Sequence, residues 1–145
     1  MPAAVDVRVV RSFHAPPEVV FDAWLDTDMI GRFMFGPALR DEEIVRLSVD
    51  ARVGGRFSFV VRRQGTEIDH VGAFREIDRP TRLVFTWGVA GQSAEESVVT
   101  IDVAPRPNDC ELELTHSMDA KWVEYAERTA AGWTKMLAAL AAAVE

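Results

Sequence analysis

The 145-residue chain has a mass of 16.1 kDa, with 48% hydrophobic and 27% charged residues. This length and composition predict a single compact domain over residues 1–145 and exclude a disordered tail. A net charge of −7 argues against a nucleic-acid partner, because phosphate contacts require a positive surface. The central segment is rich in arginine, which could form a local basic patch; the favoured interpretation is that these side chains lie on the outward face of a sheet. The residues are Arg46, Arg52, Arg56, Arg62, Arg63, Arg75, Arg79 and Arg82.

Cys110 is the single cysteine, so no intrachain disulfide can form, and no Cys/His cluster has zinc-site spacing. We therefore expect a cytoplasmic protein stabilised by packing, with no metal and no cofactor. Met1 to Phe13 lacks the apolar run of a signal peptide, and no stretch reaches the roughly 18 to 20 apolar residues of a membrane span. The expected protein has no membrane partner and exists as a monomer or a homodimer.

The first elements are a strand and two short helices. Val5–Phe13 alternates apolar and polar residues apart from the doubled Val9-Val10, which suggests a bulge. Prolines then end the strand and favour the first turn of an amphipathic helix over about Pro17–Asp26. A second helical segment, Asp28–Phe35, should stop at Gly36-Pro37, since the residue before proline avoids the helical conformation.

Residues 43–118 form a series of apolar segments separated by turn residues, without a helical pattern between them. This spacing predicts an antiparallel meander. The glycines Gly54-Gly55 suit a tight strand connection, and a phosphate-binding loop is disfavoured because no Lys-Ser/Thr follows. The expected strands are Glu43–Val49, Arg56–Arg63, Thr66–Ile77, Arg82–Val89, Glu95–Val103 and Cys110–Met118.

After Asp119, a suitable N-cap, the apolar period becomes helical for about 25 residues, or nearly 40 Å, enough to cross a sheet. Gly132 within this helix costs about 1 kcal/mol relative to alanine, which predicts close approach by a strand or by the first helix. The residues that should share one helix face are Trp122, Ala126, Thr129, Ala130, Trp133, Leu137, Leu140 and Val144.

These elements predict an α+β fold in which a curved antiparallel sheet of about six or seven strands wraps around the long C-terminal helix. Strand parity identifies the side chains between the layers, and Trp133, Met136 and Leu137 approach them from the helix. The inward residues are Phe57, Phe59, Val61, Leu83, Phe85, Trp87, Leu112, Leu114, His116 and Met118.

A family resemblance covers nearly the whole chain. The segments that carry it are Ala15–Trp24, Phe35–Pro37, Val49–Phe57, Gly72–Ile77, Pro80–Trp87 and Gly132-Trp133 with Leu137 and Leu140. In this order and spacing the chain resembles the activator-of-heat-shock-ATPase homologue branch of the START-like (SRPBCC) helix-grip superfamily, which also contains pollen-allergen-type proteins and polyketide cyclases. One departure is Met34, where relatives usually have tryptophan. Members of this superfamily often enclose a cavity between sheet and helix, and we expect the smaller and more flexible methionine to reshape one end of it.

The resemblance implies a non-enzymatic, stress-related protein with a pocket for a hydrophobic or amphipathic small molecule, such as a lipid or a polyketide-like compound. Strand parity agrees with this, although the same aromatic residues would also form an ordinary solid core. The ligand-binding candidates are Phe35, Phe57, Phe59, Phe85, Trp87, Leu112, Leu114, His116, Trp133 and Leu137.

The resemblance also implies two alternatives, a chaperone-ATPase partner and cyclase- or hydrolase-like chemistry. The chaperone activity belongs to larger relatives in which another domain accompanies this one. For catalysis, His70 and His116 are the only candidates, because no Ser-His-carboxylate or Cys-His spacing is present. Parity turns His116 inward, where a structural role is favoured, whereas the face of His70 is left open. Cys110 reads as a small structural residue.

Overall fold

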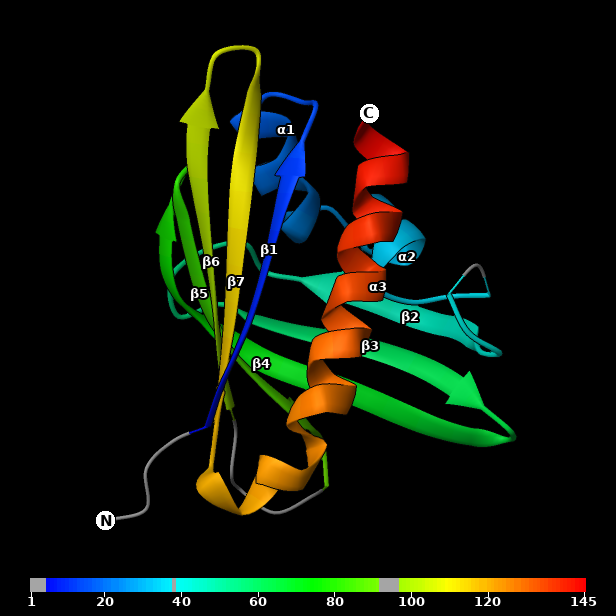
Figure 1. Cartoon of the computed structure of the whole chain (residues 1–145). Coiled ribbons are helices and arrows are strands. Elements are labelled where there is room, and N and C mark those ends of the chain that lie inside the picture. The colour runs from blue at the N-terminus through cyan, green and yellow to red at the C-terminus, as the bar shows by residue number, and fades with distance from the viewer. Residues whose placement is uncertain (1–4, 38, 92–96) are drawn as a thin grey trace.

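The computed structural model describes residues 5–37, 39–91 and 97–145 (Figure 1). The chain forms an open sheet, short helices after the first strand and a long C-terminal helix. In order, the elements are β1 (Val5–Phe13), α1 (Pro17–Asp22), η1 (Ala23–Leu25), α2 (Thr27–Phe33), β2 (Glu43–Val49), β3 (Arg56–Arg63), β4 (Thr66–Asp78), β5 (Arg82–Val89), β6 (Ser97–Arg106), β7 (Asp109–Met118), η2 (Ala120–Tyr125) and α3 (Ala126–Val144).

The two N-terminal helices follow the expected signals. Pro17 occupies the first helical position of α1, where a missing N–H costs nothing, and Val20 and Phe21 on its apolar face are buried. The predicted helix tightens into the 3₁₀ turn η1 before Asp26. The Asp26 side chain accepts a hydrogen bond from the Asp28 backbone N–H and so caps α2.

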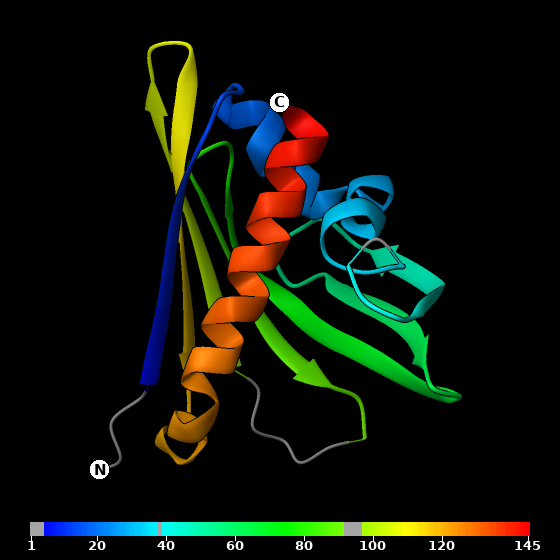
Figure 2. The same ribbon diagram turned by 45° about the vertical axis from the view of Figure 1, so that its right-hand side comes forward.

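All seven strands belong to one antiparallel sheet with the order β1-β7-β6-β5-β4-β3-β2. The strands from β2 to β7 therefore form the predicted meander, and β1 returns to pair with β7. The register shifts between Phe74 and Glu76 where β4 pairs with β5, and again between Ile44 and Arg46 in β2. Because bulges bend a strand, these shifts help the sheet to curve round α3 (Figure 2).

The bulge predicted in β1 is wrong. Val9 and Val10 pair with Leu114 and Glu113 in an unbroken register with β7. The alternation is maintained because Val10 points outward and is 51% exposed, so the doubled valine reflects an apolar residue on the solvent side rather than an extra residue in the strand.

The other predicted strands are confirmed with small changes at their ends. The strand that was predicted to end at Val103 is β6, and it continues to Arg106, because its hairpin partner β7 begins one residue before Cys110. Residues 95 and 96, with which that strand was predicted to begin, lie outside the described residues. The tight connection at Gly54-Gly55 is also confirmed, since Gly54 has a φ of +84° and a Cβ at Gly55 would lie 2.1 Å from the Asp50 carbonyl oxygen.

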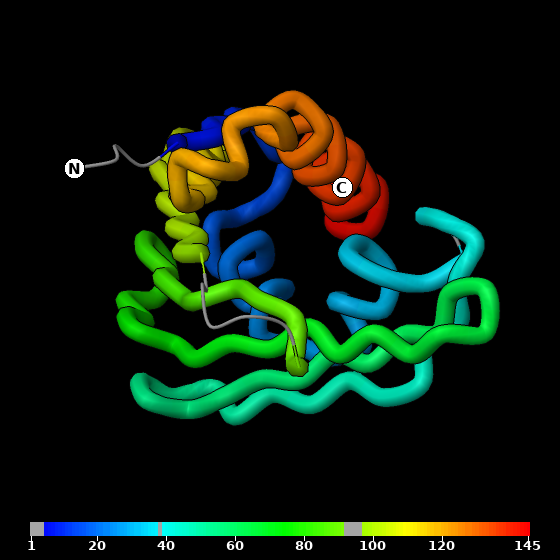
Figure 3. The backbone as a smooth tube through the Cα atoms, turned by 90° about the horizontal axis from the view of Figure 1, so that it is seen from below, coloured from blue at the N-terminus to red at the C-terminus, as the bar shows by residue number. Residues whose placement is uncertain are grey.

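The C-terminal helix lies across the concave side of the sheet (Figures 1 and 3). Asp119 caps it as expected, accepting from the Lys121 backbone N–H, but its first six residues form the 3₁₀ segment η2. Trp133, Leu137 and Leu140 are buried as predicted. Trp122 is 40% exposed, so its placement on the same face is wrong, because 3₁₀ winding breaks the α-helical period before α3 begins.

The close approach predicted at Gly132 is also wrong. Among the described residues, no atom outside the helix's own backbone lies within 4 Å of the position that a Cβ at Gly132 would take. This glycine lowers the helix propensity of α3 without a packing reason.

Arg62 and Arg82 lie on the outward face of the sheet and pair with carboxylates, as favoured from the sequence, whereas Arg63 shares the parity of the buried Val61 and contacts the buried Glu42. Arg62 contacts Glu43 and Glu67 at 2.6 and 3.0 Å, and Arg82 contacts Asp102 at 2.8 Å. None of the helices in the described part of the chain is long and apolar enough to cross a membrane.

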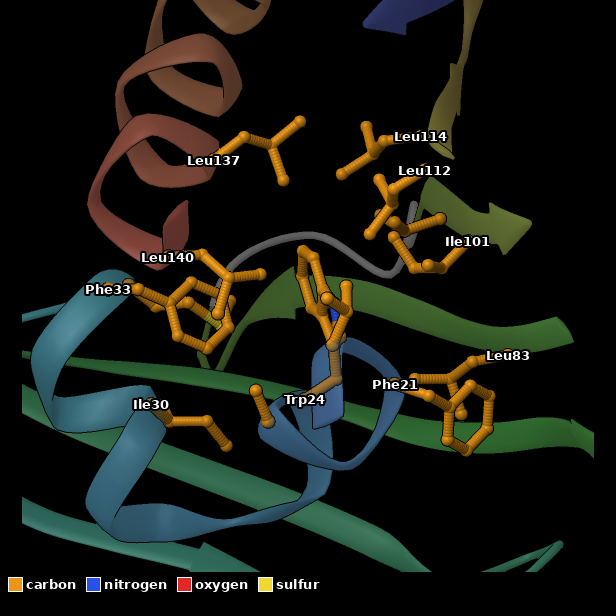
Figure 4. Packing of buried hydrophobic residues seen from close by; sticks show 14 of the residues in the cluster. Phe21, Trp24, Ile30, Phe33, Leu83, Ile101, Leu112, Leu114, Leu137 and Leu140 are labelled. Atoms are coloured by element: carbon orange, nitrogen blue, oxygen red, sulfur yellow. The ribbon is translucent and has the colours of Figure 1, made fainter. Parts of the chain in front are cut away.

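The core lies between the concave face of the sheet and the helices (Figure 4). Leu137 and Leu140 approach from α3, and Ile30 and Phe33 from α2. Side chains of β5, β6 and β7 meet them from the sheet, with Trp24 between the layers (Figure 4). The arrangement expected from the order of the elements, and identified as a helix-grip fold through the family resemblance, is therefore present.

Candidate functional site

A small hollow opens among aromatic side chains at the centre of this core. Its walls are provided by η1, the turn after α2, and strands β3, β4 and β5, and each lining residue is at most 4% exposed. About 10 Å³ is open to the centre of a water-sized sphere, which is room for about one water molecule. The lining residues are Trp24, Met34, Phe57, Phe59, Phe74 and Phe85.

Aromatic rings make a continuous wall around the hollow. Phe57 stacks on Phe59 with centroids 4.7 Å apart and meets Phe85 edge-on at 5.7 Å. Trp24 lies 6.1 Å from Trp133 of α3, so the wall joins the sheet to both helical layers. Offset and edge-to-face contacts of this kind add to the energy of area burial, which makes the wall a rigid, apolar surface.

Trp24 carries a buried hydrogen-bond donor that has no acceptor among the described residues. The residue is 3% exposed, and its indole Nε1 has no hydrogen-bond partner among the described residues. A buried donor without a partner costs about 1–3 kcal/mol, and such groups are uncommon in native structures. Among the side chains that line the hollow, Trp24 is the one that carries a conventional hydrogen-bond donor.

The structure divides the predicted ligand residues into three groups. Phe57, Phe59 and Phe85 line the hollow itself. Phe35 and Trp87 stack on each other beside it, with centroids 6.3 Å apart. The remaining ones, Leu112, Leu114, His116, Trp133 and Leu137, are buried elsewhere on the inner surface.

Sequence reasoning missed Trp24 and Phe74 as lining residues. It linked Met34 to one end of the cavity through the family resemblance but did not name it as a ligand-binding residue. Trp24 lies one turn beyond Val20 on the apolar face of the first helix, and Phe74 continues the parity of His70 in β4. Both patterns predict burial. Neither reveals that these side chains from distant segments meet at one point, because that depends on how far the sheet curls.

His116 takes part in a closed hydrogen-bond chain. The Trp133 indole N–H donates to His116 Nδ1 at 3.0 Å, so in the neutral ring the proton lies on Nε2. Nε2 then donates to Ser97 Oγ at 2.6 Å, and the Ser97 hydroxyl donates to the Trp87 carbonyl at 3.0 Å. Each donor in this chain has an acceptor, as expected of a structural network.

The surroundings of His116 make it a poor general base. Burial lowers the pKa of its imidazole to about 4, from an ordinary value of 6.5. Protonation would also place a hydrogen on Nδ1, where the Trp133 donor already points. Although Ser97 and His116 are adjacent, the serine hydroxyl donates to a carbonyl, and the two ring nitrogens of His116 pair with Trp133 and Ser97 rather than with a carboxylate.

His70 faces inward, which settles the orientation left open from the sequence. It is 8% exposed and packs against Phe35 with centroids 4.8 Å apart. Nδ1 lies 3.2 Å from the Phe59 carbonyl oxygen, so a neutral ring donates there and presents Nε2 as an acceptor. Burial lowers the pKa of His70, and the nearby Arg63 and Arg40 charges act in the same direction.

A buried carboxylate holds the turn that carries Met34. Glu42 accepts hydrogen bonds from the Gly36 backbone N–H at 2.8 Å, Arg40 at 3.1 Å and Arg63 at 2.6 Å. Burial by itself would raise the pKa of this carboxyl, but the Gly36 and Arg63 hydrogen bonds and the two arginine charges together hold the pKa below its usual range. The wall of the hollow is thereby tied to β3.

Cys110 lies within the core, where burial raises the pKa of its thiol, so it is not poised as a nucleophile. Within residues 5–37, 39–91 and 97–145, His, Cys, Asp and Glu side chains form no group of three that could hold a metal ion.

Solved structures with the same fold come from several bacteria. Protein CV1439 from Chromobacterium violaceum superposes with a TM-score of 0.83 at 25% identity, over 97% of this chain and 96% of that one. Protein Mll3558 from Rhizobium loti gives 0.79 at 24% identity, over 98% of both chains. CalU16 from Micromonospora echinospora gives 0.69 at 23% identity, over 94% of this chain and 74% of that one.

Among curated proteins, no relative matches the chain. The family model of the activator of Hsp90 ATPase homolog 1-like protein matches residues 14–145, which include the elements from α1 to α3 and every residue that lines the hollow. With the resemblance seen in the sequence thus confirmed over most of its length, the chain belongs to the activator of Hsp90 ATPase homolog 1-like family.

Proposed function

We propose that this protein binds an apolar or amphipathic small molecule in the aromatic hollow between the sheet and the helices. The observation that supports this is the wall itself, in which six buried side chains from five separate segments surround a small open space, and one of them, Trp24, carries an unpaired indole N–H. Ligand sites in proteins are concave, mostly apolar and equipped with few polar groups.

The hollow must enlarge before it can accept more than one water molecule. Met34 is the lining residue suited to moving, because an unbranched thioether side chain adopts many conformations at low cost. It lies at the end of α2, next to the segment held by Glu42, and not within a strand. Burying about 300 Å² of ligand would then contribute several kcal/mol at about 25 cal/mol per Å², before the costs of association.

The test is to fill the hollow at Met34. Binding of N-phenyl-1-naphthylamine, a neutral dye whose fluorescence rises in apolar surroundings, is titrated for the wild type and for Met34→Trp. The larger side chain removes about 60 Å² of dye contact, so we expect about tenfold weaker binding.

Val123→Trp is the matched control, because it adds the same side chain at a position that is 59% exposed on η2. The control should bind the dye as the wild type does. Absence of saturable dye binding to the wild type, or equal weakening in both variants, would contradict the proposal.

The family name supports a second candidate, an interaction with an Hsp90-type chaperone ATPase. Stoichiometric addition of this protein should then change the chaperone's ATP hydrolysis rate. An unchanged rate and no association in a pulldown would exclude the candidate. Catalysis in the hollow is disfavoured because neither candidate histidine lines it, and because His116 lies in a closed hydrogen-bond chain with a lowered pKa.

We also propose a cytoplasmic location. Its support is that the chain's single cysteine, Cys110, is buried as a free thiol in the core, a state that reducing compartments maintain. Cell fractionation tests this.

A further inference from the structure

The unpaired donor of Trp24 constrains what can occupy the hollow. The indole Nε1–H is buried, lacks a partner among the described residues, and belongs to a side chain that lines the open space. The other lining side chains are a thioether and four phenyl rings, which supply no conventional acceptor oxygen or nitrogen.

A trapped water molecule satisfies this donor poorly. Its oxygen can accept from Trp24, but buried water molecules typically make about three hydrogen bonds. In this hollow the two hydrogens of the water would face phenyl rings and the Met34 sulfur. A ketone, aldehyde, ester or ether oxygen needs no acceptor in return, so it pairs with the indole and leaves no polar atom unsatisfied.

A charged acceptor fits less well than a neutral one. The lining contains no cation, and the nearby guanidinium groups of Arg40 and Arg63 already bind Glu42. Moving a carboxylate into an apolar site without a counter-charge is far more costly than moving a neutral carbonyl.

We propose that the ligand of the hollow is a neutral, mainly apolar molecule with a carbonyl- or ether-type oxygen, and that this oxygen accepts a hydrogen bond from Trp24 Nε1. This inference rests on the proposed function and adds the chemical class of the ligand. Trp24 is then a specificity residue, which selects oxygen-bearing ligands over hydrocarbons of the same shape.

The experiment uses two probes of the same shape, acetophenone and α-methylstyrene, in which a carbonyl oxygen replaces a methylene group. Dissociation constants are measured for the wild type and for Trp24→Phe by displacement of N-phenyl-1-naphthylamine. Since a neutral hydrogen bond contributes about 1 kcal/mol, Trp24→Phe should weaken acetophenone about fivefold more than it weakens α-methylstyrene. For each probe, the dissociation constant of Trp24→Phe is divided by that of the wild type. Comparing the two ratios cancels the difference in hydrophobicity between the probes and any change in cavity size.

A second readout uses the wild-type protein alone and does not depend on the folding of the variant. In ¹⁵N-labelled protein, acetophenone should shift the Trp24 indole proton downfield relative to α-methylstyrene, since the ring currents of the two probes are alike. Trp122→Phe, at a residue that is 40% exposed, is the control variant and should bind both probes as the wild type does.

The outcomes separate the two proposals. If both probes bind but Trp24→Phe weakens them equally, or the indole proton responds to both alike, the hydrogen bond is refuted while small-molecule binding stands. If neither probe nor the dye binds the wild type, the proposed function fails and this inference fails with it.

Discussion

Residues that are chemically versatile in solution become limited by where this fold places them. His116 and His70 both face inward, and burial lowers the pKa of each imidazole. Both act as neutral hydrogen-bonding groups at neutral pH, His116 with Trp133 and Ser97, His70 with the Phe59 carbonyl. Parity predicted the inward position of His116 but contained no information about the two partners that occupy its ring nitrogens.

We predict that His116 makes the protein less stable in mild acid. Its pKa is about 4 in the folded state and near 6.5 in the unfolded state, so between these values the unfolded chain binds more protons. The contribution of the neutral His116 side chain to the free energy of unfolding is complete above about pH 6.5 and is lost as the pH falls toward 4. At about 1.36 kcal/mol per pH unit, this interval corresponds to about 3 kcal/mol.

Urea unfolding of the wild type and of His116→Gln between pH 7.5 and pH 4 should test this. The free energy of unfolding of His116→Gln should fall less steeply with decreasing pH than that of the wild type. Part of the fall that remains comes from His70, whose pKa is also lowered. Val10→Gln, which introduces the same side chain at a position that is 51% exposed and removes no titratable group, serves as the control and should retain the wild-type slope. Equal slopes in all three proteins would show that His116 does not titrate in this range.

At the scale of elements, the strands were predicted more accurately than the helices. Buried and partly exposed side chains alternate regularly along β7, whereas β3 and β5 each contain consecutive buried residues. Antiparallel pairing left little freedom in register. Helical periodicity continued unbroken from Trp122 into α3, yet the first turns are 3₁₀. The Asp119 cap signal is the same for both kinds of helix, so the sequence pattern did not distinguish them.

Gly132 in α3 is the clearest site for stabilising an element. Because no neighbouring atom lies within 4 Å of its Cβ position among the described residues, Gly132→Ala should raise the free energy of unfolding by about 1 kcal/mol through helix propensity. Ala131→Gly, at the exposed preceding position, should lower the free energy of unfolding by a similar amount. Thermal and urea unfolding measure both. Destabilisation by Gly132→Ala would reveal close packing there.

At the scale of the whole molecule, Glu42 connects segments that are far apart in the sequence. Its side chain is fully buried and joins the turn after α2 to Arg63 at the end of β3. In the sequence, Glu42 belongs to the acidic run Asp41-Glu42-Glu43 before a strand, which predicts a solvated loop. Only the folded chain shows that one of its carboxylates is enclosed and that it positions the segment bearing Met34.

We predict that Glu42→Gln lowers the free energy of unfolding by about 2 kcal/mol at pH 7, because a neutral amide cannot replace the charge-assisted hydrogen bonds that the buried carboxylate accepts. The pKa of Glu42 is held below its ordinary value of 4.5, so the contribution of the carboxylate is present above that pH and disappears as the pH falls below it. The difference between wild type and variant should therefore shrink in acid.

Glu43→Gln is the matched control, since the neighbouring carboxylate is 65% exposed and pairs with Arg62 at the surface. Its stability should differ little from that of the wild type. Equal effects of the two substitutions in urea unfolding would mean that burial of Glu42 does not contribute.

The sequence by itself determined the α+β class, the strand order of the meander, the inward face of β3, β5 and β7, and the family. These properties follow from period-two and helical patterns and from turn residues, which are local. The tertiary structure alone decided that Trp24, Met34 and Phe74 meet Phe57, Phe59 and Phe85, and that the space between them is nearly filled. The physical reason is that the size of a hollow depends on sheet curvature and on differences of a few ångströms in packing, which the bulge between Phe74 and Glu76 and the Glu42 contacts help to set.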